Sequence, residues 1–223
     1  MKISVIIPSV RDTSLNEKCL QRQTFQDFET IIVRPVGQKP AGLFYTLNRD
    51  YNRGVRQAKG ELIISYQDQI KIQHDCLERF WGHYKNNNKS IVGAVGDQYL
   101  SFNPPIKVWI DPRKRADQGS FYECLEQDVE YTLCSIPKQA IVDVGGFDEY
   151  FDHYAAIAEK ELNARMYKIG YKFYLDQSLE YEALHHPRLT ADWDEKYKEG
   201  SIYYGKCLRA INDNTRIKLN YLK

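Results

Sequence analysis

Short apolar runs alternate with amphipathic segments along the first hundred residues of the chain. The runs at 2–7, 28–33, 62–66 and 91–95 are rich in β-branched residues, which is typical of buried strands. The segments between them, most clearly 43–58, carry apolar side chains at helical spacing. This β-α-β-α-β-α-β order predicts an α/β fold with a mostly parallel, doubly wound sheet and a Rossmann-like N-terminal half.

The pattern changes in the stretch 96–135, which is rich in Tyr, Trp and Phe. We expect short antiparallel strands there at 107–110 and 130–134. Further along, the sequence predicts a long helix over 154–169 and a last strand at 171–175. The second half of the chain is therefore expected to add a smaller mixed or antiparallel portion and C-terminal helices.

A polar triplet, Gln67-Asp68-Gln69, directly follows the buried run Leu62 to Tyr66. Open α/β sheets bind their ligands outside the carboxyl ends of the strands, so this triplet is a candidate site. An ordinary strand-to-helix loop, in which Asp68 and Gln69 cap the next element, explains the same residues. On these residues alone, both interpretations stay open.

Composition narrows the class of protein. The 223 residues include 31 basic and 30 acidic side chains, so no long-range field indicates nucleic-acid binding. The five cysteines are scattered without a C-x-x-C pair, which favours free thiols in a reducing cytosol over zinc or redox chemistry. No apolar run approaches the roughly 18 residues of a membrane span, but peripheral contact with the inner face of a membrane stays open. We expect a cytoplasmic protein.

Four segments carry a resemblance to a known family. In chain order they are Ser4-Val5-Ile6-Ile7-Pro8; Gln23 to Glu29; Asn52-Arg53-Gly54 with Ala58-Lys59-Gly60-Glu61; and Gly145-Gly146-Phe147-Asp148-Glu149 with the helix to Gly170. Together they resemble the family-2 glycosyltransferases, nucleotide-sugar-dependent enzymes of the GT-A fold. The resemblance covers residues 3 to about 175.

The resemblance implies a donor site in the N-terminal half. In the family, the loop after the first strand, the end of the second strand and the helix before the central strand hold the nucleotide. The DxD metal-binding motif of the family falls on Gln67-Asp68-Gln69. The implied donor-binding residues are Pro8, Ser9, Arg11, Arg34, Arg49, Asn52, Gln67, Asp68 and Gln69.

The resemblance also implies a catalytic carboxylate at the start of the long helix. With Arg165 and Gly170 held in register, the catalytic acid of the family falls on Glu159 and its second acidic position on Glu161. In an inverting transfer this base removes the proton of the acceptor hydroxyl as the anomeric carbon is attacked. Without the resemblance, Glu159 is explained as a solvated helix carboxylate paired with a neighbouring lysine.

The chain departs from the family at the metal motif. Gln67 and Gln69 offer neutral carbonyl oxygens, so Mg²⁺ or Mn²⁺ would bind more weakly here than at DxD. In one outcome, Asp68 and Gln69 still hold a metal together with His185 or His186, in line with an occasional late histidine ligand of the family. A loop pair of histidines without ligand duty explains the same residues.

Two other outcomes stay open. Arginines such as Arg11 or Arg34 can neutralise a diphosphate without a metal. Alternatively, transfer activity has been lost, which the replacement of the second-strand acids of the family by Arg34 and Pro35 also favours.

The variable stretch 97–130 would, by the same resemblance, build the acceptor side. Its aromatic faces and charged hydrogen-bonding groups suit a surface for sugar hydroxyls. The candidate acceptor-binding residues are Trp109, Asp111 and Tyr122. A position in the hydrophobic core explains Trp109 equally well.

The expected organisation is one GT-A domain over 1–187 and a C-terminal helical extension over 188–223. Its nucleotide-binding half would be 1–96 and its acceptor-binding half 97–187. The expected activity is a hexosyltransferase-type, inverting transfer from a UDP-, GDP- or dTDP-sugar to a glycan or lipid-linked glycan in polysaccharide biosynthesis. The alternative is a non-catalytic glycosyltransferase-like protein that binds a nucleotide sugar or a glycan.

Overall fold

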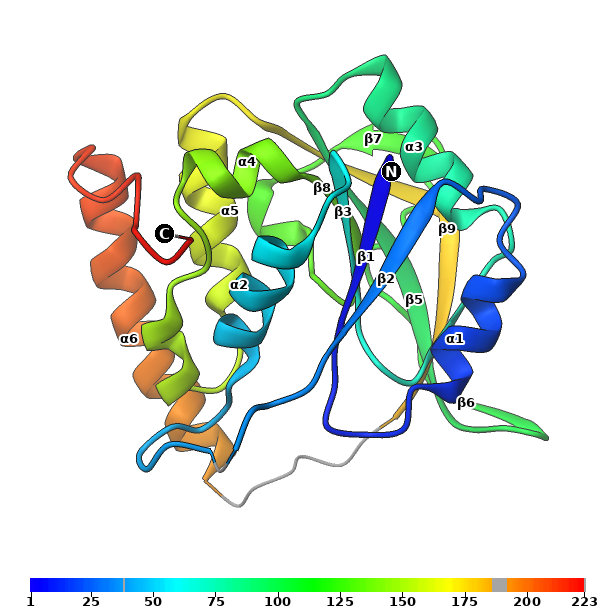
Figure 1. The fold of residues 1–223 in the computed structure, drawn as a ribbon, viewed down its shortest axis with the longest axis horizontal. Coiled ribbons are helices and arrows are strands. Elements are labelled where there is room, and N and C mark those ends of the chain that lie inside the picture. The colour runs from blue at the N-terminus through cyan, green and yellow to red at the C-terminus, as the bar shows by residue number, and fades with distance from the viewer. Residues whose placement is uncertain (38, 186–191, 223) are drawn as a thin grey trace.

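The computed structural model describes residues 1–37, 39–185 and 192–222 (Figure 1). The strands are β1 (Ile3–Pro8), β2 (Phe28–Val33), β3 (Leu62–Tyr66), β4 (Ile70–Ile72), β5 (Ser90–Phe102), β6 (Pro105–Trp109), β7 (Phe121–Glu123), β8 (Leu133–Pro137) and β9 (Lys172–Leu184). The helices are α1 (Ser14–Gln21), α2 (Leu47–Gln57), α3 (Cys76–Asn86), α4 (Lys138–Asp143), α5 (Ala158–Lys168) and α6 (Trp193–Asn212), with short 3₁₀ helices η1 (Glu126–Asp128) and η2 (Glu149–His153).

The strands of the described residues form one mixed sheet. Their order is β2-β1-β3-β8-β5-β9-β4, with β6 paired to β5 and β7 paired to β9. The pairs β1-β2, β1-β3 and β5-β9 are parallel. The antiparallel strand expected near 130–134 is confirmed as β8, and it lies inside the sheet, between β3 and β5. The parallel half predicted from the sequence is therefore split by one antiparallel strand.

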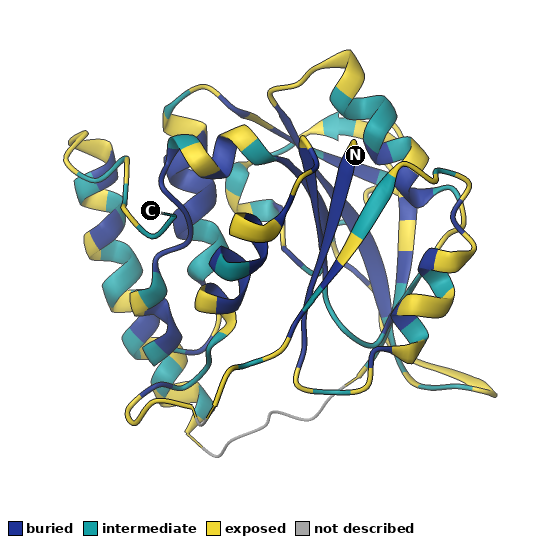
Figure 2. Cartoon of the chain, in the orientation of Figure 1, coloured by how far each residue is buried: buried dark blue, intermediate teal, exposed yellow. Residues whose placement is uncertain are grey.

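Helices cover both faces of the sheet. On one face, α1 and α3 bring Leu20, Leu77 and Phe80 into the core. On the other, α2 and α5 contribute Val55 and Leu162, and α4 packs beside them. Because both faces are covered, every residue of β1 and β3 is buried (Figure 2). This explains why the sequences of these two strands are continuous apolar runs.

Three predicted boundaries are corrected by local backbone geometry and pairing. The long helix begins at Ala158 instead of 154, because η2 and two residues with positive φ, Ala156 and Ile157, precede it. The helix predicted from 43 begins at Leu47. The last strand continues to Leu184 instead of ending at 175, because its second part pairs with β4 and β5.

The segment after α6 packs on the turn that follows α4. The Leu219 amide donates to the Val144 carbonyl at 2.9 Å, and the Tyr221 amide donates to the Gly145 carbonyl at 3.0 Å. Gly145 has a φ of +77°, and a Cβ there would lie 1.7 Å from the Leu219 carbonyl oxygen. Glycine is required at this position by both its backbone conformation and the close approach of the C-terminal segment.

The helix α6 packs against α5 and η2. It contributes the buried Cys207 and the ring of Tyr203, which contacts Phe151 at 4.9 Å between ring centroids. In the part of the chain that the structure describes, no helix has the length and apolarity to cross a membrane. All five cysteines are free thiols.

Candidate active site

Three adjoining cavities open at the carboxyl ends of β1 and β3. Their volumes are about 250, 250 and 270 Å³. The first cavity contains Glu159, the second contains Ser9 and Arg11, and Gln67 lines all three. Asp68 lines the second and third cavities. The two acids singled out in the sequence, Asp68 and Glu159, therefore border neighbouring cavities.

Strand register brings these residues together. β1 and β3 are parallel neighbours, so Ser9 and Asp68, which follow them, meet at one edge of the sheet. β8 runs antiparallel beside β3, so Thr132, which precedes it, lies next to Gln67. The Gln67 amide donates to the Thr132 carbonyl at 2.9 Å.

A hydrogen-bonded network in the second cavity engages both carboxylate oxygens of Asp68. The Ser9 hydroxyl donates to one oxygen at 2.7 Å, and the Arg11 guanidinium donates to the other at 3.2 Å. The Arg11 amide in turn donates to the Ser9 hydroxyl oxygen at 2.9 Å. Side-chain exposures of 27% for Arg11 and 15% for Asp68 leave this ion pair accessible from the cavity.

Arg34 fixes the loop that carries Ser9 and Arg11. Its guanidinium donates to the Ser9 carbonyl at 3.2 Å and to the Thr13 hydroxyl at 3.2 Å, and it also contacts the Arg11 carbonyl. Arg34 lines none of the three cavities. Its observed role is to fix the backbone that presents Arg11.

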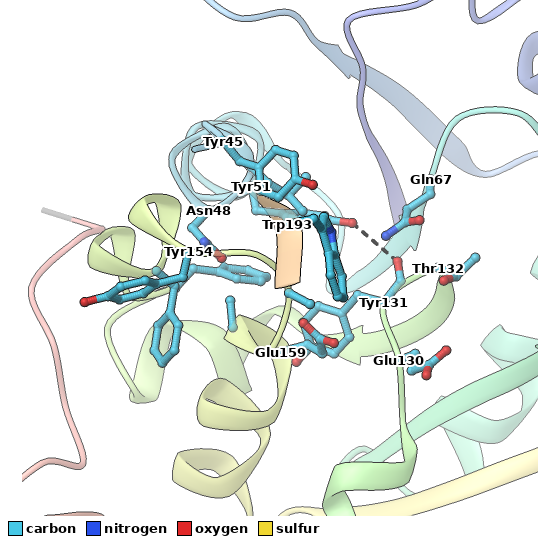
Figure 3. A pocket seen from close by; sticks show the side chains of 15 residues that line it. Tyr45, Asn48, Tyr51, Gln67, Glu130, Tyr131, Thr132, Tyr154, Glu159 and Trp193 are labelled. Atoms are coloured by element: carbon cyan, nitrogen blue, oxygen red, sulfur yellow. Dashed lines mark hydrogen bonds between the residues drawn. The ribbon is translucent and has the colours of Figure 1, made fainter. Parts of the chain in front are cut away.

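The first cavity is walled by aromatic side chains. They are Tyr45, Tyr51, Tyr131, Phe147, Phe151, Tyr154 and Trp193. Figure 3 shows the ring of Trp193, the first residue of α6, projecting into this space toward Tyr131 and Glu159. The C-terminal helix thus supplies one wall of a cavity that is also lined by α2, by α5 and by the residues that follow β3 and precede β8.

Glu159 faces this cavity without a cationic partner. Its side chain is partly exposed, and among the described residues it forms no ion pair. Burial raises the pKa of Glu159, and the negative charge of Glu130 raises it further, while Lys160 acts in the opposite direction. A carboxylate with a raised pKa in a cavity is a candidate general base.

Tyr51 links the two halves of the site. Burial raises its pKa, and the charges of Glu159 and Asp68 both add to that increase, so both carboxylates lie within electrostatic reach of its ring. Its hydroxyl is fixed by a 2.5 Å hydrogen bond with the Ser65 hydroxyl.

The start of α2, which carries part of the first cavity, is capped by a distant residue. Asp152 accepts hydrogen bonds from the Asn48 amide at 2.9 Å and from the Arg49 amide at 3.3 Å. Burial raises the pKa of Asp152 to about 6. A carboxylate at this place satisfies the free amides of the helix and favours the positive end of its dipole.

Like Arg34, two further donor residues implied by the resemblance, Asn52 and Arg49, lie outside the three cavities. Asn52 is buried, and its side chain exchanges hydrogen bonds of 2.9 and 2.8 Å with the backbone of Phe147. The Arg49 guanidinium lies 3.8 Å from Glu149 and 3.6 Å from Asp152. Both residues fasten α2 to the segment around η2, which positions the site indirectly.

Glu161 also lies away from the three cavities. It is fully buried, receives hydrogen bonds of 2.9 and 2.8 Å from Arg165, and pairs with Arg216 at 3.1 Å. Arg165 also donates to the Val144 and Gly146 carbonyls at 2.7 and 2.8 Å. This network ties α5 to the glycine turn.

The three candidate acceptor residues separate in space. Trp109, which is 39% exposed, lines the third cavity. Asp111 is buried, pairs with Arg113 at 2.6 Å and accepts from the Gly96 amide at 2.9 Å. Tyr122 donates to the Arg113 carbonyl at 2.9 Å and lines a separate cavity. Asp111 and Tyr122 therefore brace the segment around Arg113.

The proposed metal ligands are not assembled around Asp68 within the described residues. Gln69 has a φ of 60° and lines none of the three cavities. His185 is hydrogen-bonded through Nδ1 to Gln98 at 2.9 Å, and it too is absent from their walls. His186 lies outside the described residues.

One other group in the described chain has metal-ligand geometry. Ligand atoms of Asp148, Glu161 and Cys207 lie within 4.8 Å of one another. Arg216 contacts both carboxylates, and Arg165 pairs with Glu161 as well. These arginines supply the positive charge that a metal ion would otherwise provide.

Several residues of the site carried no motif in the sequence. Glu130 and Thr132 line the first and third cavities, and Tyr45 lines the first and second. Trp193 reaches the first cavity from the last helix. Glu130 and Thr132 reach the site because β8 is inserted antiparallel into the sheet, and Trp193 reaches it because α6 packs against the rest of the fold. Local sequence periodicity does not predict either arrangement.

Comparison with known proteins identifies the fold. No family model and no curated protein sequence matches the chain. The structure of S. aureus TarS 1–349 in complex with UDP matches with a TM-score of 0.59 and 13% identity, over 95% of this chain and 65% of that chain. The chain shares the mixed α/β fold of this structure. A second structure of S. aureus TarS matches with a TM-score of 0.58 and 13% identity, over 84% of this chain and 37% of that one.

This likeness supports a GT-A-like glycosyltransferase fold, and at 13% identity it reaches no further than the fold. Membership of family 2 stays a prediction. The chain spans 65% of the length of the TarS chain solved with UDP.

Proposed function

We propose that this protein is a nucleotide-sugar-dependent glycosyltransferase of family 2, with Glu159 as its catalytic base. The observation that carries the proposal is the meeting of two cavities at Gln67, one with the Ser9-Arg11-Asp68 network and one with Glu159, which has no ion-pair partner among the described residues. The nucleotide class is supported by the GT-A-like TarS structure, which was solved with UDP.

In the proposed reaction, Glu159 takes the proton of an acceptor hydroxyl. The hydroxyl oxygen attacks the anomeric carbon, the bond from that carbon to the diphosphate breaks, and the nucleoside diphosphate leaves. Attack from the side opposite the leaving group inverts the anomeric configuration. The raised pKa of Glu159 suits a group that must accept a proton near neutral pH.

The donor is proposed to lie in the second cavity. Pro8, Ser9 and Arg11 line it together with Gln67 and Asp68. Arg34, Arg49, Asn52 and Gln69 would shape the donor site through the loops and the helix that they hold. A divalent cation such as Mg²⁺ or Mn²⁺ would find one carboxylate and two amides in the triplet, which supports weak binding at most.

The acceptor is proposed to enter through the first and third cavities. The aromatic walls and Trp109 offer faces on which sugar rings pack, while Glu159 reaches the hydroxyl. Glu161, Asp111 and Tyr122 are proposed as positioning residues. A glycan or lipid-linked glycan in polysaccharide biosynthesis is the proposed acceptor, and hexosyl transfer the proposed type.

The proposed organisation is a nucleotide-binding half over 1–96, an acceptor-binding half over 97–187 and a helical extension over 188–223, with action in the cytoplasm or at the inner face of a membrane. Trp193 gives the extension a direct part in the site.

A second candidate function is non-catalytic binding of a nucleotide sugar or glycan. The engagement of both Asp68 oxygens by Ser9 and Arg11 favours it, because a metal-dependent transferase would use that carboxylate as a ligand.

A donor panel separates the two functions. Wild-type protein and Glu159→Ala are incubated with UDP-, GDP- and dTDP-sugars, with and without Mn²⁺, and nucleotide release is measured. We expect release by the wild type and its loss in the variant. Binding without release for every donor would support the non-catalytic function, and release that survives Glu159→Ala would exclude Glu159 as the base.

A further inference from the structure

The residues at the triplet do not fit the divalent cation that the fold class implies. Mg²⁺ and Mn²⁺ prefer several anionic oxygens free to coordinate them. Here Asp68 is the single carboxylate of the triplet, and its two oxygens accept from Ser9 at 2.7 Å and from Arg11 at 3.2 Å. A metal ion would have to displace a guanidinium that already neutralises this carboxylate.

The histidines do not complete the site in the described residues. His185 is engaged with Gln98 at 2.9 Å. Within residues 1–37, 39–185 and 192–222, the single group of three metal-ligating side chains is the Asp148, Glu161 and Cys207 group, which excludes Asp68.

Arg11 has the geometry of a phosphate-binding group. It lines both the second and the third cavity, at the point where Gln67 and Asp68 separate them. A guanidinium has five N–H donors, and the contact with Asp68 occupies one nitrogen, Nη1. The guanidinium forms no other hydrogen bond with the described residues, so its remaining donors can bind oxygens of a diphosphate in a bidentate arrangement.

The loop that carries Arg11 is fixed before any ligand arrives. Ser9 bridges the Arg11 amide and the Asp68 carboxylate, and Arg34 donates to the Ser9 carbonyl at 3.2 Å. A preorganised cation loses less freedom on binding than a mobile one.

We propose that Arg11 takes the place of the divalent cation and binds the diphosphate of the donor, with Asp68 as the positioning residue that orients its guanidinium. The inference rests on the proposed function, because it assumes that a nucleoside diphosphate occupies the second cavity. Its consequence is a donor site that works without metal.

The first test measures nucleotide affinity with and without metal. UDP, GDP and dTDP are titrated by calorimetry in EDTA and in Mn²⁺, and the matching nucleosides by NMR. For the nucleotide that binds, we expect affinities in the two buffers to agree within about twofold, which is close to the resolution of the method. An affinity that rises tenfold or more with Mn²⁺ would overturn the role of Arg11 and leave the proposed function intact.

The second test removes the cation alone. In EDTA, Arg11→Gln is expected to lower the affinity for the diphosphate about ten- to a hundredfold, the range for charge-assisted hydrogen bonds. Affinity for the nucleoside should stay unchanged, which also shows that the variant is folded. Arg22→Gln, on an exposed arginine at the end of α1, is the matched control and should bind like the wild type.

Two results would contradict the inference. Equal losses of nucleoside and diphosphate affinity in Arg11→Gln would mean that Arg11 shapes the cavity instead of binding phosphate. Unchanged diphosphate affinity would mean that another group carries the charge. If the wild type binds no nucleotide in either buffer, the donor site itself is rejected, and the proposed function with it.

Discussion

Glu159 and Glu161 lie two residues apart in the first turn of α5, but they differ in burial and in ion-pair partners. Glu161 is fully buried and paired with Arg165 at 2.8 Å and Arg216 at 3.1 Å. Glu159 faces the first cavity, forms no ion pair with any described residue, and has a pKa raised by burial. The comparison separates a carboxylate that fastens the helix from one that is free to take a proton.

The C-terminal segment contributes to this difference through Arg216. Arg216 contacts Asp148 as well as Glu161, and the Tyr221 hydroxyl donates to Asp148 at 2.9 Å. The Tyr221 carbonyl accepts from Arg56 at 2.7 Å, which ties the segment to α2. The C-terminal segment thus brings Arg216 to the side of α5 that carries Glu161, whereas Glu159 forms no ion pair within residues 1–37, 39–185 and 192–222.

The substitution Glu159→Gln should have the largest effect on activity. Removal of a general base typically costs about 100- to 10,000-fold in rate, and the amide keeps the shape of the side chain. The free energy of unfolding should stay equal or rise, because an uncompensated carboxylate has been removed. Nucleotide release from the donor and urea unfolding measure the two quantities. An unchanged rate would remove Glu159 from the chemistry.

The same substitution at the neighbouring acid, Glu161→Gln, should act on stability. It leaves the guanidinium of Arg165 buried without its carboxylate, and breaking a buried pair in this way costs about 3–5 kcal/mol. Urea unfolding measures the loss, with Glu199→Gln at the partly exposed pair with Lys196 as the control. A wild-type unfolding curve for Glu161→Gln would show that the two acids are not distinguished by their partners.

The substitution Arg216→Ala should destabilise the protein less. Arg216 is 21% exposed, Glu161 keeps its pair with Arg165, and the buried Asp148 keeps hydrogen bonds of 2.9 Å from the Tyr203 and Tyr221 hydroxyls, so we expect a loss of about 1–2 kcal/mol. Nucleotide affinity should not change, because Arg216 does not line the proposed donor cavity. A loss as large as that of Glu161→Gln would mean that the C-terminal segment, rather than Arg165, holds α5 in place.

The sequence predicts the elements of this protein better than the partners of its site residues. The strands at 28–33 and 62–66 have the predicted bounds. The second is buried along its whole length, so its sequence is almost entirely apolar, whereas the first is an edge strand that includes Glu29 and the exposed Thr30. The start of α5 was predicted four residues too early, since no local pattern reports the left-handed residues Ala156 and Ile157.

The candidate site shows the same limit. The resemblance pointed to Glu159 and Glu161 together, and both do lie in the first turn of one helix. What separates them is the pairing of Glu161 with Arg165, which has local helical spacing, and with Arg216, which lies 55 positions after Glu161 and follows no local spacing. The capping of α2 by Asp152 is equally invisible in the sequence, because it joins residues 104 positions apart.

The raised pKa of Glu159 predicts a pH dependence of opposite sign for rate and stability. The rate should rise with pH, because the base must be ionised to accept a proton. The midpoint of this rise should lie above pH 4.5, the ordinary pKa of glutamate. The folded state holds this proton more tightly than the unfolded state, so stability falls as pH rises through the folded pKa. Asp152, with a pKa of about 6, acts in the same direction. The difference between wild type and Glu159→Gln isolates the contribution of Glu159.

The substitution Glu130→Gln should give the smallest effect. It should shift the acid limb of the pH–rate profile and leave the maximum rate unchanged. Glu130 raises the pKa of Glu159 by charge repulsion, so its removal should move the limb to lower pH. The limb should stay above 4.5, because burial is the larger cause and persists. Arg113 keeps its 2.6 Å pair with Asp111, so the fold is retained. A pH series of nucleotide release measures the shift, and a limb that stays in place or moves upward would mean that another group controls it.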